Sequence, residues 1–346
     1  MKRTSMWAGL VAAVLAVAVV VVGMAVPGGT PQAAAADPVV LTLTGNGQTK
    51  TFTMAELQAL PAYTGVAGII NSAGTITLPQ PVKGVTVTAL MEAVGGIPDG
   101  QSVDVTAIDD YGMTFTYAEV VNGTFPVFSV TTKAEEAAKA PTSLVLLYEQ
   151  SGAAITPAPD GEGPLRLAVC QPTDVGQVAA GHLDVKWVDR IGLRNAVVPW
   201  EVKMTGLKDK KGNRQTYTLD RATFDSCATP GCHGSSWVEP ATEKTWSGVP
   251  LFLCIGKVDG GKGHGGYGAY NEALALKGYR IKLTSAGGAT AIIGSRTIRN
   301  DDKIILANKL MGADLGADYY PLRLMGPKIG EKNFVGQITT IQLLPK

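Results

Sequence analysis

TFTMAELQALP, residues 51–61, has a counterpart later in the same chain in TYTLDRATFDS, residues 216–226. Three further pairs follow in the same order: VKGVTVTALMEAVGG (82–96) with WSGVPLFLCIGKVDGG (246–261), PLRLAVCQP (164–172) with PLRLMGPK (321–328), and GHLDVKWVDRIGL (181–193) with GQITTIQLLP (336–345). Because order and spacing are both kept, the chain is predicted to contain a duplicated domain. Each copy has an ordinary single-domain size.

The predicted boundaries divide the 346 residues into three parts. Residues 1–36 form a signal peptide or N-terminal anchor, residues 37–198 the first copy, and residues 199–346 the second. Lys2 and Arg3 precede an apolar run, and a small-residue stretch ends before Asp37, which is typical of a cleaved export signal. We therefore expect an exported protein, extracellular, periplasmic or on the cell surface, with membrane contact only through an uncleaved N-terminal segment.

The net charge and the motifs of the chain limit the classes of molecule that it is expected to bind or act on. The formal net charge is +1, which argues against nucleic acid as a partner. A small-molecule substrate or a redox partner protein is expected instead. The chain has no Gly-x-Ser-x-Gly elbow and no phosphate-cradling loop, so the sequence gives hydrolase chemistry no support.

The local patterns predict a strand-dominated α+β fold, present twice. Each copy opens with a strand, a Gly/Asn turn and a second strand, which is typical of a hairpin. A short helix is expected after Thr53, with Glu56 completing a capping box, and two more in 82–96 and 246–261 that end at glycine. The runs SLVLLYE and KIILANKL, the PLRL segments and the closing segments are predicted strands.

The four cysteines fall into two settings. Cys170 and Cys254 lie in apolar runs and are predicted core residues, whereas Cys227 and Cys232 flank a Pro-Gly turn and are followed by His233. From residue types and spacing alone this cluster has three interpretations: a local disulfide, covalent haem c with His233 as a ligand, or a zinc or copper site. His264, in a glycine-rich loop, is a second ligand candidate, whereas His182 is predicted to be a structural histidine in a strand.

The second copy resembles the molybdopterin-binding domain of the sulfite oxidase superfamily. The resemblance rests on TWSGVPLFLC, NDDKIILANKLMG, YYPLRLMGP and VGQITTIQLL in the second copy, and on the DDYG turn at Asp109–Gly112 in the first. It covers nearly all of the second copy and, more loosely, the first. The resemblance implies two tandem copies of that strand-rich mixed fold and a molybdenum–molybdopterin cofactor.

The same resemblance implies the roles of individual residues. Cys232 would bind molybdenum, with Cys227 as the other candidate, while His233 and His264 would line the pocket. Three cations would bind the pterin phosphate: Arg296, Arg299 and Lys309. The loop of the first copy that corresponds to the Cys227–Cys232 loop has no cysteine, so the first copy is expected to be non-catalytic.

Three functions follow as hypotheses. The first is an exported molybdopterin-dependent oxidoreductase that transfers or removes an oxygen atom. The second is a cofactor-free binding or structural module with a Cys227–Cys232 disulfide, because the family's Cys-x-Gly-Asn-x-Arg signature is not present. The third is a c-type haem electron carrier.

Overall fold

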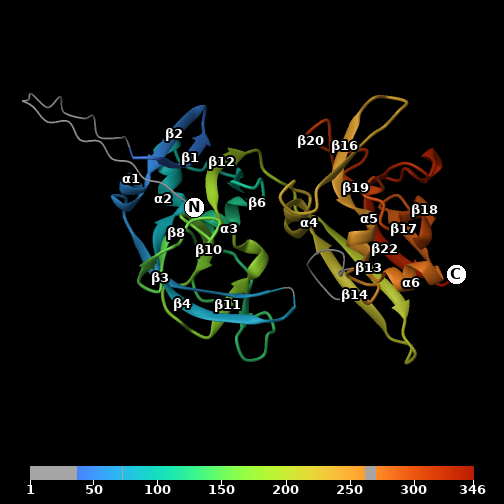
Figure 1. Ribbon diagram of the computed structural model, residues 1–346, viewed down its shortest axis with the longest axis horizontal. Helices are drawn as coiled ribbons and strands as arrows, with labels where there is room; N and C mark the ends of the chain where they lie inside the picture. The colour runs from blue at the N-terminus through green and yellow to red at the C-terminus, as the bar shows by residue number, and fades with distance from the viewer. Residues whose placement is uncertain (1–36, 72, 262–269) are drawn as a thin grey trace, which may run out of the picture. The chain divides into compact units, whose positions relative to one another are not determined.

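The computed structural model describes residues 37–71, 73–261 and 270–346, and these form a strand-rich structure with short helices (Figure 1). The predicted signal segment 1–36 and His264 lie outside the described residues. Residues 37–346 form one compact unit. Its strands make up four sheets, two in the first half of the unit and two in the second.

The first sheet has the strand order β2-β1-β12-β5-β6. Its strands are β1 (Val39–Gly45), β2 (Gln48–Thr53), β5 (Ser102–Ala107), β6 (Gly112–Phe115) and β12 (Val188–Arg194). β1 and β12 run parallel, whereas every other pair in this sheet is antiparallel. The last strand of the first half is therefore inserted between the opening hairpin and the β5–β6 hairpin.

The same strand order recurs in the second half as β14-β13-β22-β17-β18. Its strands are β13 (Glu201–Lys208), β14 (Arg214–Asp220), β17 (Arg280–Ser285), β18 (Thr290–Gly294) and β22 (Ile338–Leu344). Here too the opening strand β13 pairs in parallel with the closing strand β22. Matching order and matching direction in two sheets built from different residues are what repeated sequence segments would be expected to produce.

The remaining two sheets also correspond in part. The first runs β10-β8-β4-β3-β11-β7 with β9 beside β8, and the second runs β15-β16-β19-β20 with β21 beside β19. Their strands are β3 (Tyr63–Ile70), β4 (Ile76–Thr86), β7 (Val127–Ser129), β8 (Ser143–Gln150), β9 (Ala153–Ala154), β10 (Arg166–Cys170), β11 (Gln177–Ala180), β15 (Ser235–Val238), β16 (Thr245–Pro250), β19 (Ile305–Leu310), β20 (Ala313–Asp314) and β21 (Arg323–Met325). In both halves the PLRL segment supplies an antiparallel strand on the central buried strand, β8 or β19.

Short helices connect the strands. They are α1 (Met54–Gln58), α2 (Val87–Met91), α3 (Tyr117–Asn122), α4 (Arg221–Cys227), α5 (Leu251–Ile255), α6 (Glu272–Lys277) and α7 (Ser295–Ile298). The capping box expected at Thr53 and Glu56 is confirmed, because each side chain bonds to the other residue's backbone N–H. The helical segment that continues α2 ends at Gly95, whose backbone is in the left-handed region, as the sequence predicted.

Each half has its own main apolar core. Leu41, Leu90 and Phe115 belong to the first core, and Phe224 and Ile341 to the second. All five are no more than 1 % exposed, and burial of one such side chain contributes about 1.5–3 kcal/mol. Cys170 and Cys254 are buried in apolar clusters, which confirms the prediction for both.

One sequence expectation about His182 is wrong. The segment Gly181–Leu183 forms a turn of 3-10 helix between β11 and β12, so His182 is not in a strand, and it is exposed. Gly181 follows β11 directly, and the chain has to leave the sheet there before Val188 joins the other sheet. The apolar alternation of the segment does not reveal that change of sheet.

Two glycines explain why the repeated segment reads x-Gly-Val in both halves. Gly84 of β4 and Gly248 of β16 each follow a register shift, and a Cβ on either would collide with a backbone carbonyl of the neighbouring strand, that of Leu146 or Leu306. We expect Gly84→Ala and Gly248→Ala each to lower the free energy of unfolding by about 1–3 kcal/mol or more, because the strands must separate. Urea denaturation measures this. Gly287→Ala is the control, since its nearest contact would lie at 3.9 Å.

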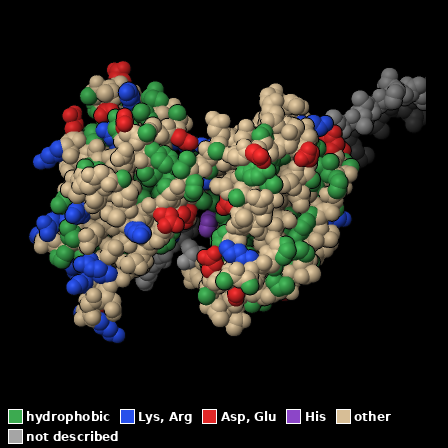
Figure 2. Space-filling model, turned by 180° about the vertical axis from the view of Figure 1, so that it is seen from behind, with side chains coloured by type: hydrophobic (Ala, Val, Ile, Leu, Met, Phe, Trp, Pro, Cys, Tyr) green, Lys and Arg blue, Asp and Glu red, His purple; other side chains and the backbone are tan. Residues whose placement is uncertain are grey.

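Acidic and basic side chains both occur on the face shown in Figure 2, in keeping with the net charge of +1. Among residues 37–71, 73–261 and 270–346, none of the helices has the length and apolar character needed to cross a bilayer.

Candidate functional site

Helix α4 carries the first cysteine of the candidate site. Asp220 caps the helix by accepting a hydrogen bond from the Thr223 N–H at 2.8 Å. Phe224 turns into the core, and Cys227 is the last residue of the helix. No capping box is present here, but the aspartate cap is sufficient to start the helix.

A compact turn after α4 brings the second cysteine back toward the first. The His233 N–H donates to the Cys227 carbonyl at 2.9 Å, and the Cys232 N–H donates to the Thr229 carbonyl at 3.1 Å. Gly234 also donates to the Thr229 carbonyl, at 3.0 Å, and a Cβ at Gly234 would collide with that carbonyl. The Pro-Gly sequence thus closes a tight loop whose ends are Cys227 and His233.

The two thiols in this loop contact one another. Cys227 and Cys232 are free cysteines, both half-buried, and their side chains share a hydrogen bond. That hydrogen bond lowers the pKa of Cys227 against the opposing effect of burial, and the Lys257 charge lowers it further. Donation to Cys227, together with burial, raises the pKa of Cys232. Of the two thiols, Cys227 is therefore the one that ionises more readily, and Cys232 the one that keeps its proton.

Lys257 supplies the positive charge in this neighbourhood. Its ammonium lies 5.3 Å from the centre of the Tyr217 ring, which holds the side chain over β14. Asp220 opposes it by raising the pKa of Cys227. The third nearby thiol, Cys254, is buried, and burial raises its pKa, so it is inert at neutral pH.

Replacement of Lys257 by Gln is expected to raise the pKa of Cys227 toward the ordinary value of 9.0, because the thiolate loses a nearby cation. The thiolate fraction at pH 7 then falls, and alkylation of Cys227 by iodoacetamide slows. The pH profile of that rate measures the pKa. The control is Lys303→Gln, since Lys303 donates instead to the Ser236 carbonyl; an unchanged profile in Lys257→Gln would contradict this role of the charge.

The turn from Asp109 to Gly112 packs against the cysteine loop. The Ser226 and Tyr111 hydroxyls lie 2.5 Å apart in a hydrogen bond, and the Tyr111 hydroxyl lies 3.5 Å from the His182 carbonyl. A Cβ on Gly231 would be 2.5 Å from the Asp109 carbonyl oxygen, so glycine permits this approach. The DDYG segment, which the sequence singled out for its resemblance, here forms one wall of the cysteine loop.

The three cations predicted to bind phosphate lie on or beside α7 and on β19. The Arg296 guanidinium donates to the carbonyls of Leu276 and Lys277, at the end of α6, at 2.9 and 3.3 Å. Arg299 pairs with Glu272 at 2.6 Å. Lys309 lies on β19 opposite Ser247. These three cations are not among the groups whose charges act on Cys227 or Cys232.

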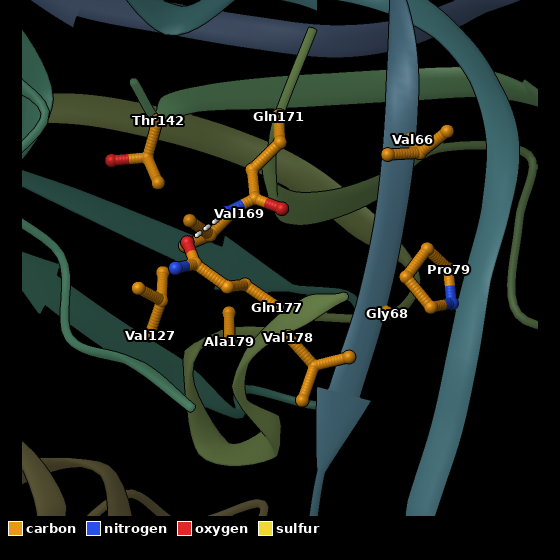
Figure 3. A pocket seen from close by; sticks show the side chains of 10 residues that line it. All are labelled: Val66, Gly68, Pro79, Val127, Thr142, Val169, Gln171, Gln177, Val178 and Ala179. Carbon is orange, nitrogen blue, oxygen red and sulfur yellow. Dashed lines mark hydrogen bonds between the residues drawn. The ribbon is translucent and has the colours of Figure 1, made fainter. Parts of the chain in front are cut away.

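Among the described residues lie two further cavities that the sequence did not indicate. One, about 10 Å³, lies between β3, β4 and β11 and has a Gln171–Gln177 hydrogen bond of 3.2 Å in its wall (Figure 3). That volume suits about one water molecule. The other, about 430 Å³, lies beside α4 and includes Arg221 and Asn308 in its lining. A lone arginine and asparagine carry no spacing signal that could have predicted it.

A second group of ionisable side chains lies in the first half, remote from the cysteines in sequence. Arg166 bonds to Asp184 at 2.6 Å and also pairs with Glu162, which in turn pairs with Lys186. Burial raises the pKa of Asp184 to about 6, against the lowering effect of Arg166. This network joins β10 to the segment before β12, and we interpret it as structural.

Because the pKa of Asp184 is raised in the folded protein, the free energy of unfolding is expected to depend on pH. The folded protein binds this proton more tightly than the unfolded chain, whose aspartate has the ordinary value of 3.8. The contribution of this proton to the free energy of unfolding is fully present below about pH 4 and is lost as the pH rises through about 6. Asp184→Asn is expected to remove that decline, measured as the urea unfolding free energy at several pH values. Asp160→Asn, an exposed control, should keep it; an equal slope in Asp184→Asn would contradict the assignment.

Comparison with known proteins finds a structural similarity but no match to a family or a curated protein. No family model matches the chain, and no curated protein matches it. Among solved structures, the chain is similar to the sulfane dehydrogenase SoxCD from Paracoccus pantotrophus, at 15% identity over 88% of this chain and 74% of that one. The TM-score is 0.33.

Proposed function

We propose that the protein is an exported thiol oxidoreductase whose reactive group is the Cys227–Cys232 pair. The observation that carries the proposal is the loop closed by the 2.9 Å bond from the His233 N–H to the Cys227 carbonyl, which brings the two thiols together. Two thiols that interact across a short closed loop can be oxidised to a disulfide and reduced again. The lowered pKa of Cys227 and its partial exposure supply the nucleophile that exchange needs.

The chemistry balances with a disulfide as the co-reactant. The Cys227 thiolate attacks one sulfur of a substrate disulfide, that S–S bond breaks, and one substrate thiolate leaves. Cys232 then loses its proton to solvent and attacks the Cys227 sulfur of the mixed disulfide. The second substrate thiolate leaves, so two protein thiols are oxidised while one disulfide is reduced to two thiols.

The fold that carries the cysteine loop is, in this proposal, a tandem pair of related halves, at 37–198 and 199–346. The recurring strand order supports this division, as do the glycines at equivalent bulges. Only the second half has the cysteine loop, while the first half contributes Tyr111 to its wall. The charged start and apolar run at the N-terminus support export, where a disulfide-forming pair is in its usual redox environment.

The molybdenum hypothesis makes different demands on the same residues. It needs the Cys232 thiolate for the metal and cations for the pterin phosphate, whereas Cys232 is hydrogen-bonded to Cys227, and Arg296 and Arg299 bind α6. These residues do not fit the cofactor, and we derive no step through it.

The test combines thiol counting with metal analysis on the purified chain and Cys232→Ser. We expect two thiols that are oxidised and reduced reversibly by a glutathione buffer, with a disulfide mapped by mass spectrometry to positions 227 and 232. Bound molybdenum at one per chain, lost in Cys232→Ser, would overturn the proposal in favour of the molybdenum enzyme. A haem absorption band would overturn it in favour of the electron carrier, and a disulfide resistant to reduction would favour the structural module.

A further inference from the structure

The outer face of the sheet β14-β13-β22-β17-β18 carries cations and no carboxylate over three rows of residues. Buried residues alternate with exposed or half-buried ones along its strands, so one set of side chains faces the core and the other faces away from it. The outward residues form rows across the sheet, which are Thr218–Lys203–Thr340–Thr284–Thr290, Thr216–Thr205–Gln342–Lys282–Ile292 and Leu344–Arg280–Gly294. This face therefore offers hydroxyl groups and positive charge.

The three cations of these rows have no carboxylate partner among the described residues. Lys203 and Arg280 are exposed, and Lys282 is half-buried. Within residues 37–71, 73–261 and 270–346, Lys203 and Lys282 form no ion pair or hydrogen bond, and Arg280 bonds through its Nε to the Pro345 carbonyl at 3.1 Å. The whole chain has 30 Lys and Arg against 29 Asp and Glu, so the excess on this face is a local separation of charge.

The β13–β14 hairpin, which forms one side of this face, is acidic at one end and basic at the other. Glu201 lies opposite Asp220 at the open end of the hairpin. The closed end exposes three further lysines and one aspartate, which are Lys208, Lys210, Lys211 and Asp209. Lys and Arg side chains gather at the lower end of the second half, at the left of Figure 2, where this hairpin ends. The positive charge of the face thus continues onto the end of the hairpin.

The corresponding face of the first half has paired charges. The rows that begin at the Thr-Gly dipeptide of each opening strand are Thr44–Gly192–Asp104 in the first half and Thr205–Gln342–Lys282 in the second. An aspartate therefore stands in the row position where the second half has a lysine. Asp104 pairs with Arg194 at 3.6 Å, and Arg190 pairs with Asp110 at 2.8 Å. Because the first half forms the same sheet with paired charges, the unpaired cations are not a requirement of the fold.

The distribution of these cations fits a bilayer surface better than a linear polymer. Arg280 and Lys282 lie two residues apart on one strand, about 7 Å, and Lys203 lies two strands away, about 10 Å across the sheet. The charges therefore extend in both directions of a face about 20 Å wide. Neither of the two cavities described above includes these residues. Ile292, which is 47% exposed, adds an apolar side chain to the same face.

We propose that this face binds the surface of an anionic lipid bilayer, where Lys203, Arg280 and Lys282 meet lipid phosphates. Each cation near such a surface strengthens binding about fivefold, and salt screens the effect because the Debye length is about 8 Å at physiological ionic strength. Cys227 and Cys232 lie at the end of α4 and in the loop after it, and neither belongs to this face. The proposal therefore holds whether or not the thiol pair exchanges with disulfides.

The first test is lysine footprinting of the full chain, in which acetylation by an N-hydroxysuccinimide ester is followed by mass spectrometry. The vesicles contain phosphatidylcholine alone or phosphatidylcholine mixed with phosphatidylglycerol. We expect Lys203 and Lys282 to be acetylated several-fold more slowly with the anionic vesicles only, and the protection to be lost at about 1 M salt, where the Debye length is about 3 Å. Lys244, an exposed lysine before β16, is the internal control and should react at the same rate throughout.

The second test measures the preference for anionic over neutral vesicles by flotation. Lys203→Gln combined with Lys282→Gln should lower that preference about 30-fold, the effect of removing two cations. Lys244→Gln is the matched control and should keep it. The ratio of the two affinities removes any contribution of the N-terminal apolar run, because both vesicles and all variants share it.

Three results would overturn the proposal. The first is equal acetylation of Lys203 and Lys282 with anionic and neutral vesicles, and the second is an unchanged preference in the double variant. The third is protection by soluble dextran sulfate with none by anionic vesicles, which would assign the face to an acidic polymer. The footprint uses the unaltered chain, so it decides the proposal even if the double variant fails to fold.

Discussion

Cys227→Ser is expected to reduce the rate of exchange with a small aromatic disulfide by at least about a hundredfold, because the hydroxyl that replaces the thiol does not ionise at neutral pH. The other thiols do not substitute for it. Burial raises the pKa of Cys170 and Cys254, and the pKa of Cys232 is also raised. The measurement is the absorbance of the released aromatic thiolate under pseudo-first-order conditions.

Cys232→Ser should give a different result from Cys227→Ser. The first attack is retained, since Cys227 is still present, but the mixed disulfide is no longer resolved and accumulates. Its mass is therefore expected on position 227 after one equivalent of substrate. Cys170→Ala, a buried site in the first half, is the matched control and should exchange at the parent rate. Equal loss in both cysteine variants would contradict separate attacking and resolving roles.

The local elements of the fold were largely predictable from the sequence, for a physical reason. Thr53 and Glu56 cap α1 through contacts three residues apart. Gly95 ends the helical segment after α2 through its own backbone conformation. Such interactions depend on neighbours in the sequence, so spacing alone reveals them. The burial of Cys170 and Cys254 followed in the same way from the apolar runs around them.

The candidate site was predictable only in part. The cysteine loop is local, and its Pro-Gly turn indicated that Cys227 and Cys232 approach one another. The wall of the loop is not local, because Tyr111 meets Ser226 across 115 residues of sequence. That contact depends on the order of the strands in the sheets, and the residue spacing around Tyr111 or Ser226 does not predict it.

The contacts of Arg296 and Arg299 are a second feature that the sequence does not show. Helix α6 ends at Lys277 with carbonyl groups that have no partner inside the helix, and the Arg296 guanidinium satisfies two of them. Glu272 in the first turn of the same helix takes Arg299. A sequence shows that arginines are present, but which acceptors lie near them follows from the packing of α7 on α6.

Arg221→Met is expected to lower the free energy of unfolding by about 3–5 kcal/mol, because it leaves a carboxylate without its cation in a poorly solvated place. Arg221 is 6% exposed and bonds to Asp225 at 2.6 Å and to the Thr114 carbonyl at 3.3 Å. Urea denaturation measures the loss. Arg299→Met is the control, since its pair with Glu272 is exposed and worth about 0–1 kcal/mol.

The pH dependence of that loss identifies its cause. Burial already raises the pKa of Asp225, and Arg221 opposes the rise. Without Arg221 the pKa rises further, so the folded variant holds a proton that the unfolded chain releases, and its stability declines as the pH increases. The deficit of Arg221→Met should therefore be smaller at about pH 4 than at pH 7, and Arg221→Met combined with Asp225→Leu should recover much of it at pH 7. A deficit that is equal at both pH values would mean that Arg221 stabilises the protein through packing of its side chain and not through its charge.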